Sequence, residues 1–351
     1  MRRPSHVNVG RLSLAALMFA LPLAANAQEQ QPTVATYTTW ITGLAFSPDG
    51  NTLASVGGQT LLYRPGEIRL WDPNSGQLKA TYTGHNTVVT AVAFSPDGQT
   101  LATAGYDGTL KLWNVADGKE KASVAAHQHW IMGLAYSPDG QTLVTASEDA
   151  TAKLWNVTVT PPAEKLALKG HMGAVMGVAY AADGQSVATA SGDKTAIVWN
   201  PTNGEVIKKL EGHTDAVSAV AFVLDGKTLA TGSHDRTVKL WNIAEGKEIA
   251  TLAGHHNWIG SIRASSDGKA LASASHDRTV KLWNLETKQE TATLKAYKST
   301  VWAVAFSPVA QLLATGSHSD SLTIWRQGWV ESFPHVAPPA QPGNVTASAA
   351  K

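Results

Sequence analysis

Four kinds of side chain that can do chemistry together recur five times in this sequence at constant spacing. In each set an Asp lies 22 residues after a His and six residues before a Trp, with a Ser or Thr between them. The five sets are His85, Thr103, Asp107 and Trp113; His127, Thr145, Asp149 and Trp155; His171, Thr189, Asp193 and Trp199; His213, Thr231, Asp235 and Trp241; and His255, Ser273, Asp277 and Trp283. A hydroxyl, an imidazole and a carboxylate are the components of an acyl-transfer triad, so a single set would suggest a hydrolase.

The recurrence of these sets argues against catalysis. A nucleophilic site needs one activated hydroxyl in one pocket, whereas this chain repeats the whole set. The other interpretation is a structural chain of hydrogen bonds, and we favour it. Within a buried network, losing one member leaves its partner unpaired, at about 1–3 kcal/mol. We therefore expect the sets to hold the fold together, and we predict no catalytic residue.

The elements that position these side chains are marked by seven Trp residues. The spacing between successive members is 42 residues, except for one interval of 44, where Pro161-Pro162 lies in a longer loop. The seven are Trp71, Trp113, Trp155, Trp199, Trp241, Trp283 and Trp325. A constant period of this length indicates a repeat architecture.

One unit of the repeat predicts four short β-strands. In the unit that starts at Gly212, an apolar run over Val217–Val223 is followed by strand patterns over Thr228–Ser233, Thr237–Ile243 and Glu248–Leu252. Four strands in ~40–45 residues form one blade of a β-propeller. We therefore predict an all-β fold, a seven-bladed propeller of four-stranded antiparallel blades.

The repeat resembles the WD40-repeat family. Its Gly-His and Trp-Asp signatures match Gly84-His85, Gly170-His171, Gly212-His213, Gly254-His255 and Trp71-Asp72, and Trp-Asn stands in other units. The resemblance covers residues 33–326. It implies that each set of four residues forms a tetrad running from the indole through the hydroxyl and the imidazole to the carboxylate. It also implies that Thr33–Tyr37 closes the ring beside the strand of Trp325, which removes two open sheet edges.

Two units depart from the tetrad pattern. The first keeps Ser55 and Trp71 but has neither the His nor the Asp. In the seventh, Tyr297 replaces the His and Ser319 replaces the Asp. These two units are neighbours across the ring closure, so we expect the closure to be the least stable part of the ring.

Residues 1–27 predict an export signal. Arginines precede the apolar run Leu12–Ala24, which is too short to span a membrane comfortably. Ala25-Asn26-Ala27 offers a cleavage site, with cleavage expected between Ala27 and Gln28. We expect a periplasmic or secreted protein with no membrane span after cleavage. Residues 28–32 form a short segment before the propeller of 33–326, and a flexible Pro/Ala-rich tail is expected over 327–351.

The composition argues against several classes of ligand. A formal net charge of +1 provides no basic field for nucleic acid. The sequence contains no Gly-rich phosphate loop, no HExxH and no EF-hand pattern, so we predict no cofactor. His234, His276 and His318 recur at the 42-residue period. Equivalent positions on neighbouring blades should be too far apart to ligate one ion at ~2.1 Å, so we predict no metal.

Partners of WD40 propellers often dock on the face that carries the loops before the first strand and between the second and third strands. Three positions per repeat are expected to point toward that face: the third and fifth residues after the His, and the residue before the Asp. These positions differ between copies, whereas most others are nearly identical, as expected for a surface adapted to one asymmetric partner. Many hold the aromatic residues and Met enriched at interfaces. The predicted partner-binding residues are Trp40, Tyr106, Trp130, Met132, Glu148, Met176, His234, Trp258, His276, Trp302 and His318.

The sequence therefore predicts a non-enzymatic scaffold that binds a protein or peptide outside the cytoplasm and is a monomer on its own. One alternative is an exported, lactonase-like propeller hydrolase with its site at the mouth of the central channel. That site would need convergent carboxylates or imidazoles, and the variable positions offer only Glu148 and three His residues. A second alternative is an assembly role within a larger envelope complex.

Overall fold

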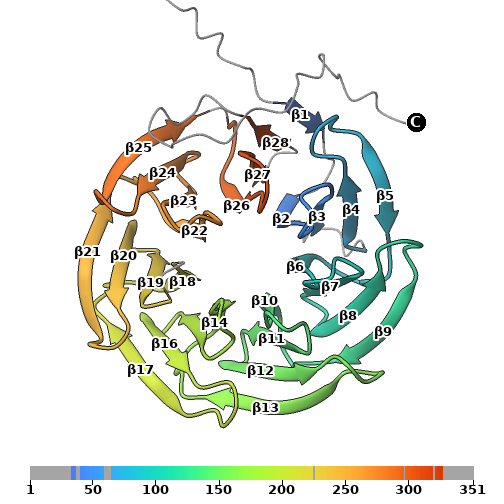
Figure 1. Ribbon diagram of the computed structural model, residues 1–351, viewed down its shortest axis with the longest axis horizontal. Helices are drawn as coiled ribbons and strands as arrows, with labels where there is room; N and C mark the ends of the chain where they lie inside the picture. Colours follow the sequence, from blue (N-terminus) through green and yellow to red (C-terminus); the bar gives the residue numbers. More distant parts are fainter. Residues whose placement is uncertain are drawn as a thin grey trace, which may run out of the picture.

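A computed structural model describes residues 33–36, 40–58, 65–223, 226–295, 297–318 and 321–326 of the 351-residue chain. These residues form seven four-stranded antiparallel sheets arranged in a ring around a central opening (Figure 1). The predicted all-β seven-bladed propeller is thus confirmed. The predicted signal, the segment 28–32, the tail 327–351 and Ser319 lie outside the described residues. Within the described part of the chain, no helix is long and apolar enough to cross a membrane.

The first four blades follow one another along the chain. Blade 1 contains β2 (Trp40–Phe46), β3 (Leu53–Gly58), β4 (Glu67–Trp71) and β5 (Leu78–Tyr82). Blade 2 contains β6 (Val89–Phe94), β7 (Thr100–Gly105), β8 (Thr109–Asn114) and β9 (Glu120–Ala125). Blade 3 contains β10 (Ile131–Tyr136), β11 (Thr142–Ser147), β12 (Thr151–Asn156) and β13 (Ala163–Lys169). Blade 4 contains β14 (Val175–Tyr180), β15 (Val187–Ser191), β16 (Thr195–Trp199) and β17 (Val206–Glu211).

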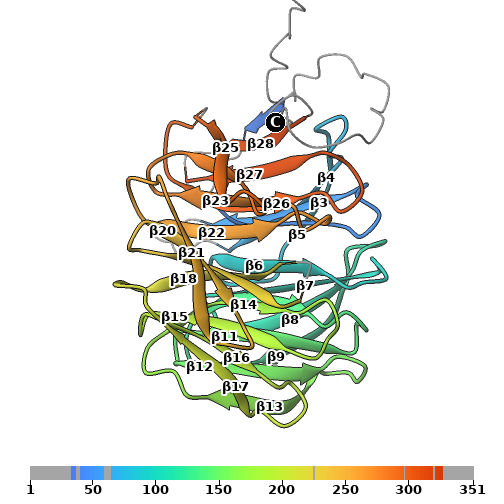
Figure 2. The ribbon, with the colours of Figure 1, turned by 60° about the vertical axis from the view of Figure 1, so that its left-hand side comes forward.

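The remaining blades complete the circle, which the turned view shows from another direction (Figure 2). Blade 5 contains β18 (Val217–Phe222), β19 (Thr228–Ser233), β20 (Thr237–Asn242) and β21 (Lys247–Ala253). Blade 6 contains β22 (Ile259–Ala264), β23 (Ala270–Ser275), β24 (Val280–Asn284) and β25 (Gln289–Leu294). Blade 7 contains β26 (Val301–Phe306), β27 (Leu313–Ser317) and β28 (Ser321–Trp325), together with β1 (Thr33–Thr36).

The ring is closed by β1, the earliest strand in the chain. It pairs antiparallel with β28, in a register that runs from Thr33 opposite Ile324 to Thr36 opposite Ser321. The last blade therefore takes its outer strand from the beginning of the chain, as predicted. Because this pairing covers the outer edge of β28, neither end of the ring is left with an open blade.

The strands differ in burial according to their place in the blade. In β3, β11 and β23, each the second strand of its blade, every residue is buried. The fourth strands lie at the rim of the disc (Figure 1) and expose alternate or consecutive residues, as in β9. This gradient explains why the second strands read as continuous apolar and small residues, while the fourth strands are more polar.

The apolar core lies between neighbouring blades. At the boundary of blades 1 and 2, Trp113 of blade 2 packs in one cluster with Ile68 of blade 1. At the closure, Ile41 of blade 1 packs with Leu322 and Ile324 of blade 7. Each blade therefore packs against the blade before it and the blade after it. The loops at the ends of the blades are supported by this continuous ring of packed sheets.

Candidate functional site

The tetrads of blades 2 to 6 are continuous chains of hydrogen bonds. In blade 2, Trp113 Nε1 donates to Thr103 Oγ1 at 2.8 Å, and Thr103 Oγ1 lies 2.8 Å from His85 Nε2. His85 Nδ1 lies 2.9 Å from Asp107 Oδ2. With the ring in its neutral form, the hydroxyl that accepts from the indole donates its own proton to Nε2, and the ring proton lies on Nδ1, facing the carboxylate.

The other four tetrads have the same geometry. Their three links are 2.7–2.9 Å long in every case. This arrangement has the order of a Ser-His-Asp triad, but each central hydroxyl residue has an exposed fraction of 0%. A nucleophile must reach its substrate, and these five hydroxyls have no access to one.

Burial and hydrogen bonding set the protonation states of the tetrads. Burial alone would raise the pKa of Asp107, but hydrogen bonds from His85 and Thr109 and the charge of His85 lower it to about 2. Burial lowers the pKa of His127 and of His171 below the ordinary value, despite the carboxylate beside each ring. The pKa values of their partners Asp149 and Asp193 are lowered as well, so at neutral pH the tetrads of blades 3 and 4 pair a neutral imidazole with an ionised carboxylate.

The two blades at the closure lack the imidazole of the tetrad. In blade 1, Trp71 Nε1 donates to Ser55 Oγ at 2.7 Å. In blade 7, the Tyr297 hydroxyl donates to Thr315 Oγ1 at 2.7 Å, and Trp325 Nε1 lies 3.0 Å from the Tyr297 hydroxyl. The phenol thus stands where Nε2 of the imidazole stands in other blades. It has no second ring nitrogen, so it cannot extend the chain to a carboxylate.

Six of the predicted partner-binding residues form one continuous row, which we call the aromatic arc. It consists of His234, Trp258, His276, Trp302, His318 and Trp40, so imidazoles alternate with indoles across blades 5, 6, 7 and 1. Successive ring centroids are 4.5, 5.5, 4.4, 6.4 and 3.8 Å apart. His234 meets Trp258, the third residue after the His of the next blade, whereas His276 meets Trp302, the fifth residue after Tyr297, and both contacts join neighbouring blades on the loop face.

A second, smaller aromatic pair lies on blades 2 and 3. Tyr106 stacks on Trp130 with centroids 4.0 Å apart and an interplanar angle of 18°. Burial, with the nearby charge of Glu148, raises the pKa of the Tyr106 phenol, which is therefore neutral at physiological pH. Tyr106 precedes the Asp of blade 2 and Trp130 is the third residue after the His of blade 3, so this pair joins neighbouring blades as His234 and Trp258 do.

Backbone hydrogen bonds hold the two loops of a blade together beneath these rings. His276 N donates to the Trp258 carbonyl at 2.9 Å, and Glu148 N donates to the Trp130 carbonyl at 2.9 Å. His318 N donates in the same way to the Thr300 carbonyl at 2.9 Å. The aromatic side chains are thus presented from a fixed backbone, which lowers the entropy lost when a partner binds.

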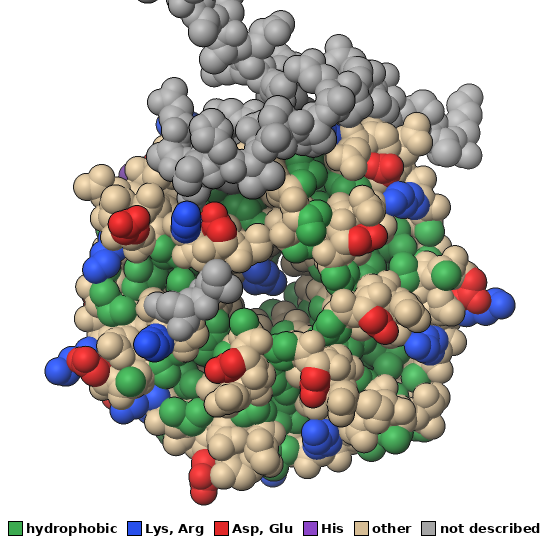
Figure 3. All heavy atoms as spheres, in the orientation of Figure 1, with side chains coloured by type: hydrophobic (Ala, Val, Ile, Leu, Met, Phe, Trp, Pro, Cys, Tyr) green, Lys and Arg blue, Asp and Glu red, His purple; other side chains and the backbone are tan. Residues whose placement is uncertain are grey.

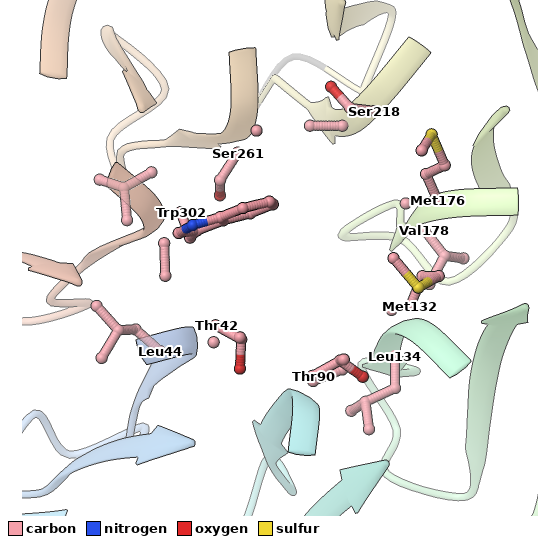
Figure 4. Close-up of a pocket in the computed structure, with 18 of the residues that line it drawn as sticks. Thr42, Leu44, Thr90, Met132, Leu134, Met176, Val178, Ser218, Ser261 and Trp302 are labelled. Atoms are coloured by element: carbon pink, nitrogen blue, oxygen red, sulfur yellow. The ribbon is translucent and has the colours of Figure 1, made fainter. Parts of the chain in front are cut away.

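Met132 and Met176 lie at the central channel rather than in the aromatic arc. They line one side of the lumen, and the indole of Trp302 extends into it from the opposite side (Figure 4). Trp302 therefore belongs both to the aromatic arc and to the channel wall. The expected partner-binding residues form a row of rings, a stacked pair and a channel mouth, with Glu148 exposed beside the pair.

The expectation that the third and fifth residues after the His point outward does not hold in every repeat. Val88, Thr90 and Ser218 are buried. The Thr90 hydroxyl donates to the Ile131 carbonyl of the next blade, and Ser218 donates likewise to the Ile259 carbonyl. These hydroxyls fasten one blade to the next, so part of the variation among copies reflects packing between blades.

The sequence analysis did not identify two residues that the structure places at the loop face or in the channel. Met172 follows the tetrad residue His171 and has an exposed fraction of 94%, in the loop before the first strand of blade 4. Arg263 lines the channel. The other six blades have Ala at the equivalent position. Both could have been found by comparing all positions of the repeat, because a polar residue follows the His in the other tetrads and Ala occupies the place of Arg263 elsewhere.

The described residues contain no group of three or more His, Asp or Glu side chains able to hold a metal ion. The aromatic arc shows why its imidazoles do not converge. Trp258 lies between His234 and His276, and Trp302 lies between His276 and His318. An indole thus separates each imidazole from the next, so the row is a stacked surface.

Comparison with known proteins agrees with this architecture. The family model described as WD domain, G-beta repeat, matches the chain seven times, at residues 29–72, 76–114, 118–156, 163–200, 204–242, 246–284 and 288–326. The seven matches cover more than half of the chain, and each contains the outer strand of one blade and the first three strands of the next. No curated protein matches the chain.

Proposed function

The chain belongs to the WD40-repeat family, and from this premise we propose that it is a non-enzymatic scaffold that binds a protein or peptide partner outside the cytoplasm. Propellers of this family generally bind protein partners. The observation that carries the proposal is the aromatic arc, a row of six rings on the loop face. The partner is proposed to dock there and on the Tyr106–Trp130 pair.

The exposure of the rings supports this surface as the docking site. Trp130, Trp258 and Trp302 have exposed fractions of 44%, 46% and 37%. Each of these indoles contacts at least one further ring, so its orientation is restrained while one side stays open to solvent. Restrained, amphipathic aromatic side chains provide contact area at low entropic cost, which is why Trp and Tyr dominate binding hot spots.

The hydrolase alternative lacks comparable support. It needs carboxylates or imidazoles that converge at the channel. Among the described residues that line the channel, none is an Asp, a Glu or a His. We therefore keep the scaffold as the proposed function.

The proposed location outside the cytoplasm rests on the predicted signal in residues 1–27. The first WD40 match begins at residue 29, directly after the expected cleavage site. Expression of the full chain in an exporting host should yield a mature protein that begins at Gln28. N-terminal sequencing of protein from the periplasm or medium tests this, and an uncleaved cytoplasmic chain would contradict it.

Affinity capture tests the scaffold proposal. The purified protein is used as bait in envelope extract at two salt concentrations, beside the variants Trp258→Ala and Trp302→Ala. The matched control is Val309→Ala, which also removes an exposed apolar side chain, but from the turn between β26 and β27 at the opposite end of the blade. We expect a specific partner that both Trp variants lose and the control retains. Equal capture by all four proteins, or no partner together with hydrolysis of lactones or esters, would contradict the proposal.

A further inference from the structure

Arg263 breaks the repeat at one position of the channel wall. It lies in β22, the innermost strand of blade 6, and pairs in register with Ala272. The equivalent residues pair with Ala in the same way in blades 5 and 7, where Ala221 faces Ala230 and Ala305 faces Ala314. All six equivalents of Arg263 are alanines: Ala45, Ala93, Ala135, Ala179, Ala221 and Ala305.

The guanidinium has no counter-ion within the described residues. Its Nη1 donates to the neighbouring Ile262 carbonyl at 2.8 Å, and the described part of the chain supplies no other hydrogen bond or ion pair. Arg263 is the only charged residue among those that line the channel. Arg263 is exposed to solvent, and the packing of the blades around it lowers its pKa. Four of its five N–H donors therefore remain for a ligand.

The channel around Arg263 is otherwise neutral and small. The cavity has a volume of about 100 Å³, which suits a carboxylate on a short stem. Its hydroxyl groups include Thr42 and Thr90, which already donate to backbone carbonyls. Figure 3 shows that the ring is open at its centre on the face drawn there and that a basic side chain lies in the opening.

Arg263 and Trp302 lie at different depths of the channel. Trp302 is the second residue of β26, whereas Arg263 occupies the fifth position of β22. Three strand positions correspond to roughly 10 Å along the backbone, and both side chains line the same cavity. Of the aromatic arc, only Trp302 is among the described residues that line this cavity, so a ligand at Arg263 would occupy the channel rather than the rest of the arc.

We propose that Arg263 makes the central channel a binding site for a carboxylate. A guanidinium presents two parallel N–H donors that match the two oxygens of a carboxylate. One negative charge neutralises the one positive charge of the lumen, whereas a phosphate dianion would leave a net negative charge there. The carboxylate belongs either to a small organic acid or to an Asp or Glu side chain inserted by a peptide.

Calorimetric titration with two probes tests this proposal and separates the two sources. The first probe is propionate, a monocarboxylate on a short stem, and the second is a blocked peptide with a single Asp, compared with its Asn counterpart. Arg263→Ala is the test variant, because it gives blade 6 the residue found in the other six blades and should therefore fold normally. Lys269→Ala is the control, since it removes one positive charge from an exposed position of the same blade.

We expect at least one probe to bind the wild type, and Arg263→Ala to weaken that binding by about ten- to a hundredfold. Lys269→Ala should bind as the wild type does, and Arg263→Lys should be intermediate. Absence of saturable binding by either probe at tens of millimolar would overturn the proposal. So would equal affinity in wild type and Arg263→Ala, or tighter binding of inorganic phosphate than of propionate. The scaffold proposal is tested by other residues, so either proposal can fail while the other stands.

Discussion

The indole of Trp40 stacks on the imidazole of His318, with ring centroids 3.8 Å apart and an interplanar angle of 29°. Trp40 begins β2 in blade 1, and His318 follows β27 in blade 7. The first and last blades are therefore joined on the loop face by this stack, and blade 7 is completed at its outer edge by β1. The aromatic arc therefore crosses the closure of the ring at Trp40 and His318, so the proposed binding surface depends on an intact closure.

Replacing Trp40 should weaken the closure. An aromatic pair contributes about 0.5–1.5 kcal/mol beyond the area it buries, so Trp40→Ala should lower the free energy of unfolding by at least that amount. Urea denaturation followed by circular dichroism measures the change. Trp40→Phe keeps a ring on His318 and should recover much of the loss. Equal stability of Trp40→Ala and wild type would show that the stack contributes nothing to closure.

Removing one tetrad hydroxyl should be costly, because two buried nitrogens lose their partner. Thr231 Oγ1 lies 2.7 Å from His213 Nε2 and accepts from Trp241 Nε1 at 2.8 Å. Thr231→Val keeps the shape but leaves both nitrogens unpaired, so we expect a loss of about 2–4 kcal/mol in the free energy of unfolding. Thr202→Val, at an exposed turn of blade 4, is the matched control and should change stability by less than about 0.5 kcal/mol. A similar effect of both substitutions would refute the structural role of the tetrad.

Stability should fall steadily in acid. The pKa values of His127 and His171 are lowered by burial, so the unfolded chain takes up protons at these residues at a higher pH than the folded chain. The free energy of unfolding therefore decreases as the pH falls below about 6.5. Asp107 and Asp193 have a pKa of about 2 in the folded protein against an ordinary value of 3.8, which adds a second loss below about pH 4. Urea midpoints measured between pH 8 and pH 3 check this, and maximal stability near pH 5 would contradict it.

Blades 1 and 7 should exchange their amide protons faster than blades 2 to 6. Blade 1 has neither the His nor the Asp of the tetrad, and Tyr297 replaces the His in blade 7, so the imidazole–carboxylate pair that resists local opening in the other blades is missing from both. Hydrogen exchange followed by mass spectrometry compares the second strands β3 and β27 with β11 and β19. Equal protection in all four strands would show that the carboxylate end of the tetrad adds no local stability.

The fold could be predicted from the sequence because the same pattern of strands and Trp residues occurs seven times. The Trp period gives the number of blades, and the four strand patterns after Gly212 give their content. In blade 5 the first and third strands end one residue earlier than predicted, and the fourth extends one residue further at each end. Strand ends depend on the turns that follow them, which the apolar pattern does not resolve.

The candidate site was predictable only in part. The positions of Trp258 and His276 on one loop face follow from their offsets in the repeat, but their contact with rings of neighbouring blades depends on the angle between blades. Thr90 looked like a variable surface residue, whereas its hydroxyl bonds to the Ile131 carbonyl of the next blade. A single repeat does not encode such contacts, because each one needs the spatial relation of two repeats.

Site-specific photocrosslinking tests the central claim, that partners dock on the aromatic arc, most directly. A photoreactive phenylalanine analogue is placed at Trp258, and in a separate protein at Gln141, which is exposed in the turn between β10 and β11 at the opposite end of the blade. After irradiation in envelope extract, we predict a discrete protein adduct from position 258 and none from position 141. Adducts from position 141 alone, or equal adducts from both positions, would contradict the claim.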